Sequence, residues 1–144
     1  MRRQDRGRWI ARRSWGWLAL GLLLATLSSA PSPAQQQKRW AALDPNSETS
    51  SPVVWAPTEA EARQRATEAC KRLSKTCANG PAATDDLGDV FAVMCCTQPR
   101  VGCAVAAAGN RRDAMRNVQK MFGDAGYSGC ALKHYMSAAS GKKQ

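Results

Sequence analysis

Apolar side chains recur with a helical period in the segment that follows Thr58. They are spaced one, three or four residues apart, which places them on one face of a helix. Thr58 and Glu61, three residues later, form the pattern of a capping box, so we expect the helix to begin at Thr58. The positions expected to be buried are Ala62, Ala66, Ala69, Cys70 and Leu73.

A second segment with the same period follows Asn110. Asparagine is a favourable N-cap residue, and Asp113 lies three residues later, where its carboxylate suits the first turn. Gly123 is the expected C-cap residue. The positions expected to be buried in this helix are Ala114, Met115, Val118, Met121 and Phe122.

Short runs rich in Val, Ala, Cys and Trp predict β-strands around these two helices. The polar stretch 79–89, rich in Gly, Pro and Asp, has no apolar period and indicates a linker or long loop. Together these elements predict an α+β domain, in which two helices pack on one face of a small antiparallel sheet. The expected strands are 38–44, 52–56, 89–97, 101–108 and 128–136, with a weaker one near 75–79.

The chain also matches itself at an offset of 52 positions. Residues 53–56 fall on 105–108, and Glu61-Ala62 falls on Asp113-Ala114. The match repeats residue classes and local signals rather than residue identities. It predicts two half-repeats, at about 38–79 and 90–136, each with the order strand, strand, helix, strand.

Residues 1–34 have the pattern of a secretory signal peptide. Six arginines precede the apolar run 17–27, which is well short of the roughly 20 residues that span a bilayer. Small residues before the predicted cleavage site after Ala34 give a mature domain of residues 35–144. An uncleaved membrane anchor is the alternative; after cleavage we expect no membrane span.

The predicted cleavage changes the meaning of the charge. The whole chain carries +10, but residues 1–34 account for +5, which leaves +5 on residues 35–144. This mild positive charge does not indicate a nucleic-acid partner.

Six cysteines follow the predicted signal peptide. An even number of cysteines in an exported chain indicates disulfides, in the periplasm or outside the cell. The sequence alone permits fifteen pairings. The cysteines are Cys70, Cys77, Cys95, Cys96, Cys103 and Cys130.

Local geometry favours one of these pairings. Cys95 and Cys96 are neighbours on an expected strand, so their side chains point to opposite faces and should have different partners. Cys96 and Cys103 flank a predicted tight turn. The expected pairs are therefore Cys70–Cys77, Cys96–Cys103 and Cys95–Cys130.

Several short segments of the chain form a further pattern. They are the run Trp40 to Pro45, the Ala-rich helix ending in Cys70, Cys77, the run Gly102 to Ala106, and Gly129-Cys130-Ala131. These segments resemble an exported bacterial family, the domain-of-unknown-function family numbered 4189. The resemblance covers most of 39–136 and implies export and the fold more than an activity, because the family has no general assigned function. The vicinal Cys95-Cys96 and the acidic linker before it depart from the family pattern.

The alternative to three structural disulfides is a site for a soft metal such as copper, or a thiol-handling role. Its ligands would be Met94, Cys95, Cys96, His134 and Met136. His134 is the only histidine, and no catalytic motif accompanies it, so we expect neither enzymatic activity nor a cofactor.

A stripe of basic residues on the second predicted helix is the candidate partner-binding surface. Arg112, Arg116 and Lys120 lie four residues apart, beside Arg111. Such a stripe is often only the solvated face of a helix, but it also suits an acidic partner protein, an anionic envelope polymer or lipid headgroups. We expect Trp55 and Tyr127 to be exposed aromatic anchors.

These features predict an exported, non-enzymatic, disulfide-stabilised binding protein. Its specific form would be an inhibitor or immunity protein that acts on an envelope or secreted protein. The alternative is a periplasmic metal- or thiol-handling accessory protein.

Overall fold

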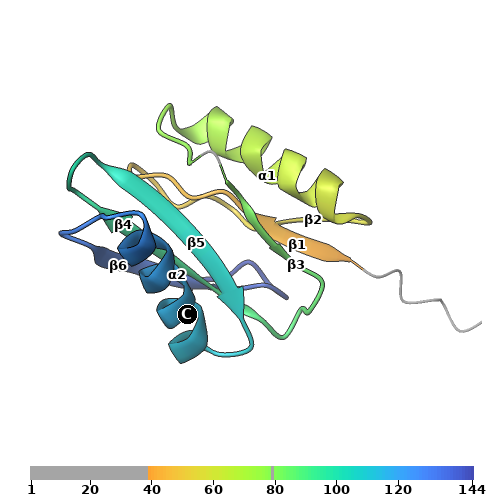
Figure 1. Cartoon of the computed structure of the whole chain (residues 1–144). Helices are drawn as coiled ribbons and strands as arrows, with labels where there is room; N and C mark the ends of the chain where they lie inside the picture. The colour runs from red at the N-terminus through yellow and green to blue at the C-terminus, as the bar shows by residue number, and fades with distance from the viewer. Residues whose placement is uncertain (1–38, 79) are drawn as a thin grey trace, which may run out of the picture. The chain divides into compact units, whose positions relative to one another are not determined.

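A computed structural model of the chain describes residues 39–78 and 80–144. The described residues form two α-helices and two antiparallel sheets of three strands each (Figure 1). The signal peptide predicted for residues 1–34 and its cleavage site lie outside the described residues. Within them, no helix has the length and apolar character needed to cross a membrane.

The central strand of the first sheet is the first strand in the chain. β1 (Trp40–Leu43) pairs antiparallel with β2 (Val54–Ala56) on one side and with β3 (Ala82–Thr84) on the other. Helix α1 (Glu59–Leu73) connects β2 to β3 and packs on this sheet.

The second sheet repeats this arrangement. β4 (Val90–Cys96) is central and pairs antiparallel with β5 (Gly102–Ala108) and β6 (Ala131–Ser137). Helix α2 (Arg111–Asp124) connects β5 to β6. Each half therefore has the order strand, strand, helix, strand, which confirms the predicted α+β class and the repeated order of elements. The third strand of the first half, β3, lies beyond the predicted end of that half at residue 79.

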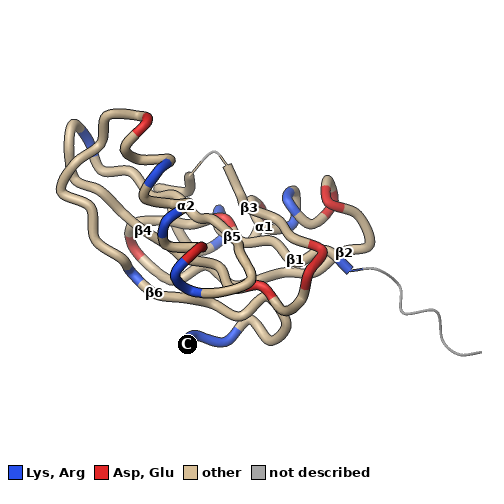
Figure 2. Tube along the Cα trace, turned by 60° about the horizontal axis from the view of Figure 1, so that its bottom comes forward, with Lys and Arg blue, Asp and Glu red and all other residues tan. Residues whose placement is uncertain are grey.

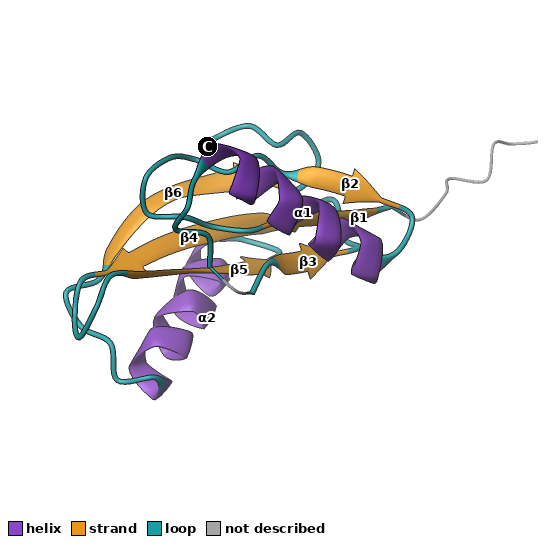
Figure 3. Ribbon diagram, turned by 90° about the horizontal axis from the view of Figure 1, so that it is seen from above, coloured by secondary structure: helices purple, strands orange, loops and turns teal. Residues whose placement is uncertain are grey.

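The sequence predicted a single sheet with both helices on one face, and this layer arrangement was wrong. The two sheets pack against each other, and each helix covers the outer face of its own sheet (Figures 1 and 3). Alternate residues explain this, since Leu43 faces the other sheet while Ala42 faces α1. A strand that is apolar on both faces requires a layer on each side of its sheet.

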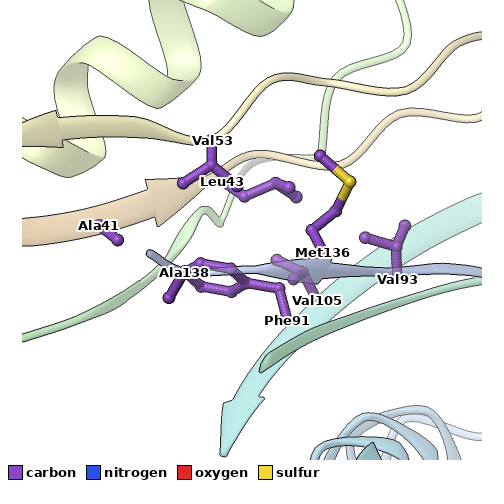
Figure 4. Packing of buried hydrophobic residues seen from close by; sticks show 8 residues of the cluster. All are labelled: Ala41, Leu43, Val53, Phe91, Val93, Val105, Met136 and Ala138. Atoms are coloured by element: carbon purple, nitrogen blue, oxygen red, sulfur yellow. The ribbon is translucent and has the colours of Figure 1, made fainter. Parts of the chain in front are cut away.

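The central core lies between the two sheets. Side chains from β1 and from β4, β5 and β6 meet there, with Phe91 fully buried (Figure 4). This cluster joins the two half-repeats. It consists of Ala41, Leu43, Val53, Phe91, Val93, Val105, Met136 and Ala138.

Two smaller cores lie under the helices. Ala62 and Ala66 of α1 pack against Ala42 and Ala56 of the first sheet. These small side chains let the helix approach the strands closely, although each buries little apolar area. The core under α2 is larger and consists of Ala92, Met94, Cys96, Ala106, Ala114, Val118 and Phe122.

Both helices begin where the sequence predicted. The Glu61 amide donates to Oγ1 of Thr58 at 3.3 Å, and the Asp113 amide donates to Oδ1 of Asn110 at 2.9 Å. These bonds satisfy amide groups that have no partner within the helix.

The C-terminal prediction for α2 was wrong. The helix continues through Gly123 to Asp124, and the chain reverses at Gly126, whose φ of +71° favours glycine. Two residues expected to be buried are instead about half exposed: Met121 is 50% exposed and Leu73 is 51% exposed. Both lie near the C-terminal end of a helix, where the sheet beneath no longer covers that side.

β3 lies inside the stretch 79–89 that the sequence predicted to be a loop. Its Ala-Ala-Thr sequence has no strand signal of its own, and it forms because β1 offers a free edge. The weaker strand expected near 75–79 is only an isolated bridge between Asn46 and Cys77.

The end of the described chain folds back along the outer edge of β6. The Ser137 amide donates to the Lys142 carbonyl at 2.9 Å, and the Gln144 amide donates to the Tyr135 carbonyl at 3.1 Å. This turn covers the last part of an edge strand.

Three disulfides join all six cysteines, and one pair, Cys70–Cys77, is the expected one. The other two pairs exchange the partners that the sequence favoured. Cys95 lies opposite Cys103 across β4 and β5, whereas Cys96 lies opposite Gly102. The predicted pairing placed Cys96 opposite Cys103, one residue away from the observed register of β4 and β5. A shift of one residue turns each side chain of a strand to the other face of the sheet. The observed bonds are Cys95–Cys103 and Cys96–Cys130.

These two disulfides lie on opposite faces of the second sheet. Cys96 is fully buried under α2, while Sγ of Cys95 lies 3.8 Å from the Asn46 carbonyl oxygen on the side of the first sheet. One bond fastens β4 to β5 and the other fastens β4 to the start of β6.

The three disulfides should differ in their contribution to stability because they close loops of different length. Cys96–Cys130 spans 34 residues and should contribute about 4 kcal/mol through the entropy of the unfolded chain. Cys95–Cys103 spans 8 residues and should contribute about 2.5 kcal/mol. Urea unfolding of the two paired alanine variants measures both losses.

Replacing Cys70 and Cys77 by alanine is the matched control, because that loop of 7 residues is nearly as short as the one closed by Cys95–Cys103. Equal losses for all three variants would show that loop closure does not set their stability.

Candidate interaction surface

The residues of the alternative metal site do not converge. Cys95 and Cys96 are both joined in disulfides. Met94 and Cys96 face α2, whereas Met136 lies in the core between the sheets. Over residues 39–78 and 80–144, no group of three or more His, Cys, Asp or Glu side chains is arranged to hold a metal ion.

His134 lies in β6 opposite Val93, on the face that meets the first sheet. Its Nε2 is buried and has no hydrogen-bond partner in the described part of the chain. Burial is the main cause that lowers the pKa of His134 below its ordinary value of 6.5, and the charges of Lys143 and Lys133 lower it further. The imidazole is therefore neutral near pH 7 and has a structural place in the sheet.

Asp44, which directly follows β1, is the other unusual titratable group. It is fully buried, and neither carboxylate oxygen has a hydrogen-bond partner among the described residues. Burial raises the pKa of Asp44. The side-chain hydroxyl of Thr67 and the positive charge of Lys71, both on α1, favour the ionised form but offset only part of this effect. The sequence pattern did not predict this buried carboxylate, whose only signal is its place directly after three apolar positions.

The predicted partner-binding residues are all exposed and all belong to α2, along which Figure 2 marks Lys and Arg positions in blue. Arg111, at the first turn, has its guanidinium 5.4 Å from the ring centroid of Tyr135, and its Nε donates to Oε1 of Gln144 at 3.4 Å. These contacts orient the Arg111 side chain over the second sheet.

The other three basic residues differ in their pairing. Arg116 forms an ion pair with Asp113 at 3.1 Å, and Lys120 forms one with Asp124 at 2.7 Å. Arg112 is exposed, and no described residue bonds to it. The ion pairs are exposed to solvent and therefore contribute little, about 0–1 kcal/mol each. They also leave the helix surface with an excess of positive charge.

A groove lies beside this surface because α2 does not cover the whole sheet. The helix packs on β4 and β5, and leaves the same face uncovered near the start of β6. The groove has a volume of about 270 Å³. Its lining includes Met94 from β4, Met115 and Phe122 from α2, and Cys130 before β6.

Tyr127 closes one side of the groove, so the expected exposed anchor is in fact half-buried. Its ring meets that of Phe122 edge to face, with 5.3 Å between centroids. Nε of Arg100 donates to the Tyr127 hydroxyl at 3.1 Å. The ring crosses directly over Gly102, where a Cβ atom would lie 3.1 Å from it. A side chain at that position would therefore crowd the Tyr127 ring, which would have to shift by a few tenths of an ångström.

The other expected aromatic anchor, Trp55, is also half-buried. Its ring packs against the core between the sheets, and Nε1 donates to the Ala138 carbonyl at 2.9 Å. A separate hollow of about 290 Å³ lies beside it, with Arg39 and Arg65 in its lining. Arg65 is already bonded to Glu61 and to the Trp55 carbonyl, so its charge is already paired within the domain.

Comparisons with protein-family models, curated proteins and solved structures found no match to this chain. The resemblance to family 4189 therefore stays a prediction. The features that bear on function are the disulfides, the basic surface of α2 and the groove beside it.

The stability of the domain should fall as the pH drops from about 7.5 to about 5.5. The unfolded chain binds a proton at the histidine near pH 6.5, whereas the folded domain resists protonation of His134, so acid favours unfolding. Urea unfolding at several pH values measures this slope.

His134→Leu is the control variant for this slope, because it removes the only histidine of the chain. Protonation of Asp44 has the opposite sign, since its raised pKa makes the folded state gain stability as the pH falls. A slope that is unchanged in His134→Leu would contradict the assignment to His134.

The purified domain should contain no reactive thiol, even when it is denatured without a reductant, because all six cysteines are paired. Titration with a thiol reagent before and after reduction measures this. Two or more free thiols in the unreduced protein would contradict the pairing and favour the metal or thiol-handling alternative.

Proposed function

We propose that this protein is an exported, disulfide-stabilised binding domain that recognises an acidic surface of another protein through α2. The observation that carries this proposal is the set of basic side chains along one helix, with Arg112 exposed and unpaired in the described structure. A charged surface of this kind attracts a partner of opposite charge and orients it during encounter.

The rigidity of α2 supports the proposal. Ala114, Val118 and Phe122 anchor the helix on the second sheet, and the Cys96–Cys130 disulfide lies beneath it. Arg111 is already held over Tyr135. A surface that is ordered before binding loses less conformational entropy when the partner arrives.

The disulfides support an exported location. Three disulfides in a domain of this size are typical of the periplasm or the extracellular space, where thiols are oxidised. The basic and apolar pattern of residues 1–34 indicates the same route.

The specific form that we propose is an inhibitor or immunity protein that blocks an envelope enzyme or a secreted toxin. A small stapled domain with one preformed basic helix suits this role, because it can cover an acidic site on its target without changing shape. The metal- or thiol-handling alternative lacks comparable support, since both thiols that it needs are joined in disulfides.

The test is capture of a partner from a periplasmic extract by the mature protein, compared with the double variant Arg112→Glu/Arg116→Glu. We expect a stoichiometric protein partner whose binding weakens with salt and falls about a hundredfold or more on charge reversal. The matched control, Arg72→Glu/Lys75→Glu, makes the same charge change at the end of α1 and should leave binding unchanged.

Two results would contradict the proposal. One is an extract that yields no stoichiometric partner. The other is a partner whose binding tolerates the α2 variant as well as it tolerates the α1 control, because the basic side chains of α2 would then make no contribution.

A further inference from the structure

We propose that the groove between α2 and the start of β6 is an anchor pocket for one aromatic side chain of the partner, presented by an acidic segment. This inference rests on the proposed function, because it places the same partner on α2. It adds the chemistry of the contact: an apolar anchor that enters the groove and carboxylates that meet the arginines beside it.

The size of the groove suits a single side chain. Its volume of about 270 Å³ lies just below the range of roughly 300–1,000 Å³ that is usual for small-molecule sites. Met94 is 2% exposed and forms part of the lining, so the groove reaches down to the core of the second sheet. An aromatic ring seated there would remove apolar surface from water, both its own and that of the lining.

The lining favours an aromatic ring over a charged group. The thioethers of Met94 and Met115 and the sulfur of Cys130 are polarisable, and sulfur makes favourable contacts with aromatic rings. Phe122 and Tyr127 add two rings, already arranged edge to face. A third ring can extend this arrangement in the offset or edge-to-face geometry that aromatic pairs prefer.

The groove is held open before any partner binds. The Cys96–Cys130 disulfide holds the wall on the β6 side, and the bond from Arg100 holds the ring of Tyr127. A preformed pocket of this kind is typical of the positions that contribute most to the affinity of a protein interface.

The charge around the groove indicates the rest of the partner segment. At 100° per residue, Arg112 and Arg116 lie on the same side of α2 as Gln119 and Gly123, which line the groove. Its lining contains no acidic residue. Carboxylates on either side of the anchor would therefore meet Arg112, which has no partner in the described domain, and Arg116, whose ion pair is exposed.

The groove can be filled without changing these charges. Gly123 lies in its lining, and a Cβ atom at this position would meet open space. Leucine is also a better helix former than glycine, so Gly123→Leu should fold at least as stably as the native domain. Asn117→Leu is the matched control, because position 117 is exposed on the opposite side of the same helix.

The experiment measures fluorescence anisotropy of labelled peptides bound to the mature domain. The main probe has one central phenylalanine flanked on each side by aspartates; a second probe has serine in place of the phenylalanine. We expect the serine probe to bind at least tenfold more weakly. Gly123→Leu should weaken binding of the phenylalanine probe by a similar factor, whereas Asn117→Leu should leave its binding unchanged. Arg112→Glu should weaken binding of both probes.

Methyl NMR spectra locate the binding site directly. With the phenylalanine probe, the methyl signals of Met94 and Met115 should shift, because both line the groove. The signal of Met136 should not, because that residue lies in the core between the sheets.

Equal binding of the two probes, binding that Gly123→Leu does not alter, or no binding of the phenylalanine probe would overturn the anchor pocket. The proposed function is judged separately, by partner capture with the α2 charge-reversal variant. A partner that is lost on charge reversal but retained by Gly123→Leu would overturn the anchor pocket alone.

Discussion

The register of β4 against its two neighbours is the constraint on which the rest of the domain depends. Because side chains alternate along a strand, this register sends Phe91 and Val93 into the core between the sheets and Met94 and Cys96 under α2. It also decides the disulfides, since cysteines can bond across a pair of strands only where they lie opposite each other. One bond on each face of the second sheet then prevents β4 from slipping against either neighbour.

This cross-linking compensates for a core made of small residues. Alanine is the commonest residue under α1 and supplies three of the seven buried residues of the core under α2. Each alanine contributes little hydrophobic free energy, so four closely packed layers bury less apolar area than the same fold with larger side chains. A domain of this size gains most from bonds that restrict its unfolded state. The same cross-linking holds the wall of the groove beside α2 and so links stability to the binding surface.

Much of the fold could be predicted from signals that are local in the sequence. The helix starts at Thr58 and Asn110 depend on a side chain and an amide three residues apart, and the half-repeats depend on the order of such signals. The errors came from tertiary pairing: β3 forms only because β1 offers an edge, and one residue of register exchanged the partners of Cys95 and Cys96. For the candidate site, the basic residues were evident from their spacing. The groove was not, because it results from α2 leaving β6 uncovered.

The turn that follows β6 has a consequence for how copies of this protein meet. An edge strand normally presents a row of free backbone donors and acceptors, and such a row is a template for strand addition by a neighbouring molecule. Here the Ser137 amide donates to the Lys142 carbonyl, and the Tyr135 carbonyl accepts from the Gln144 amide, so these edge groups of β6 are already paired. The chain thus protects this part of its own sheet from aggregation at high concentration. Any association through α2 is left to depend on side chains rather than on intermolecular β-pairing at this edge.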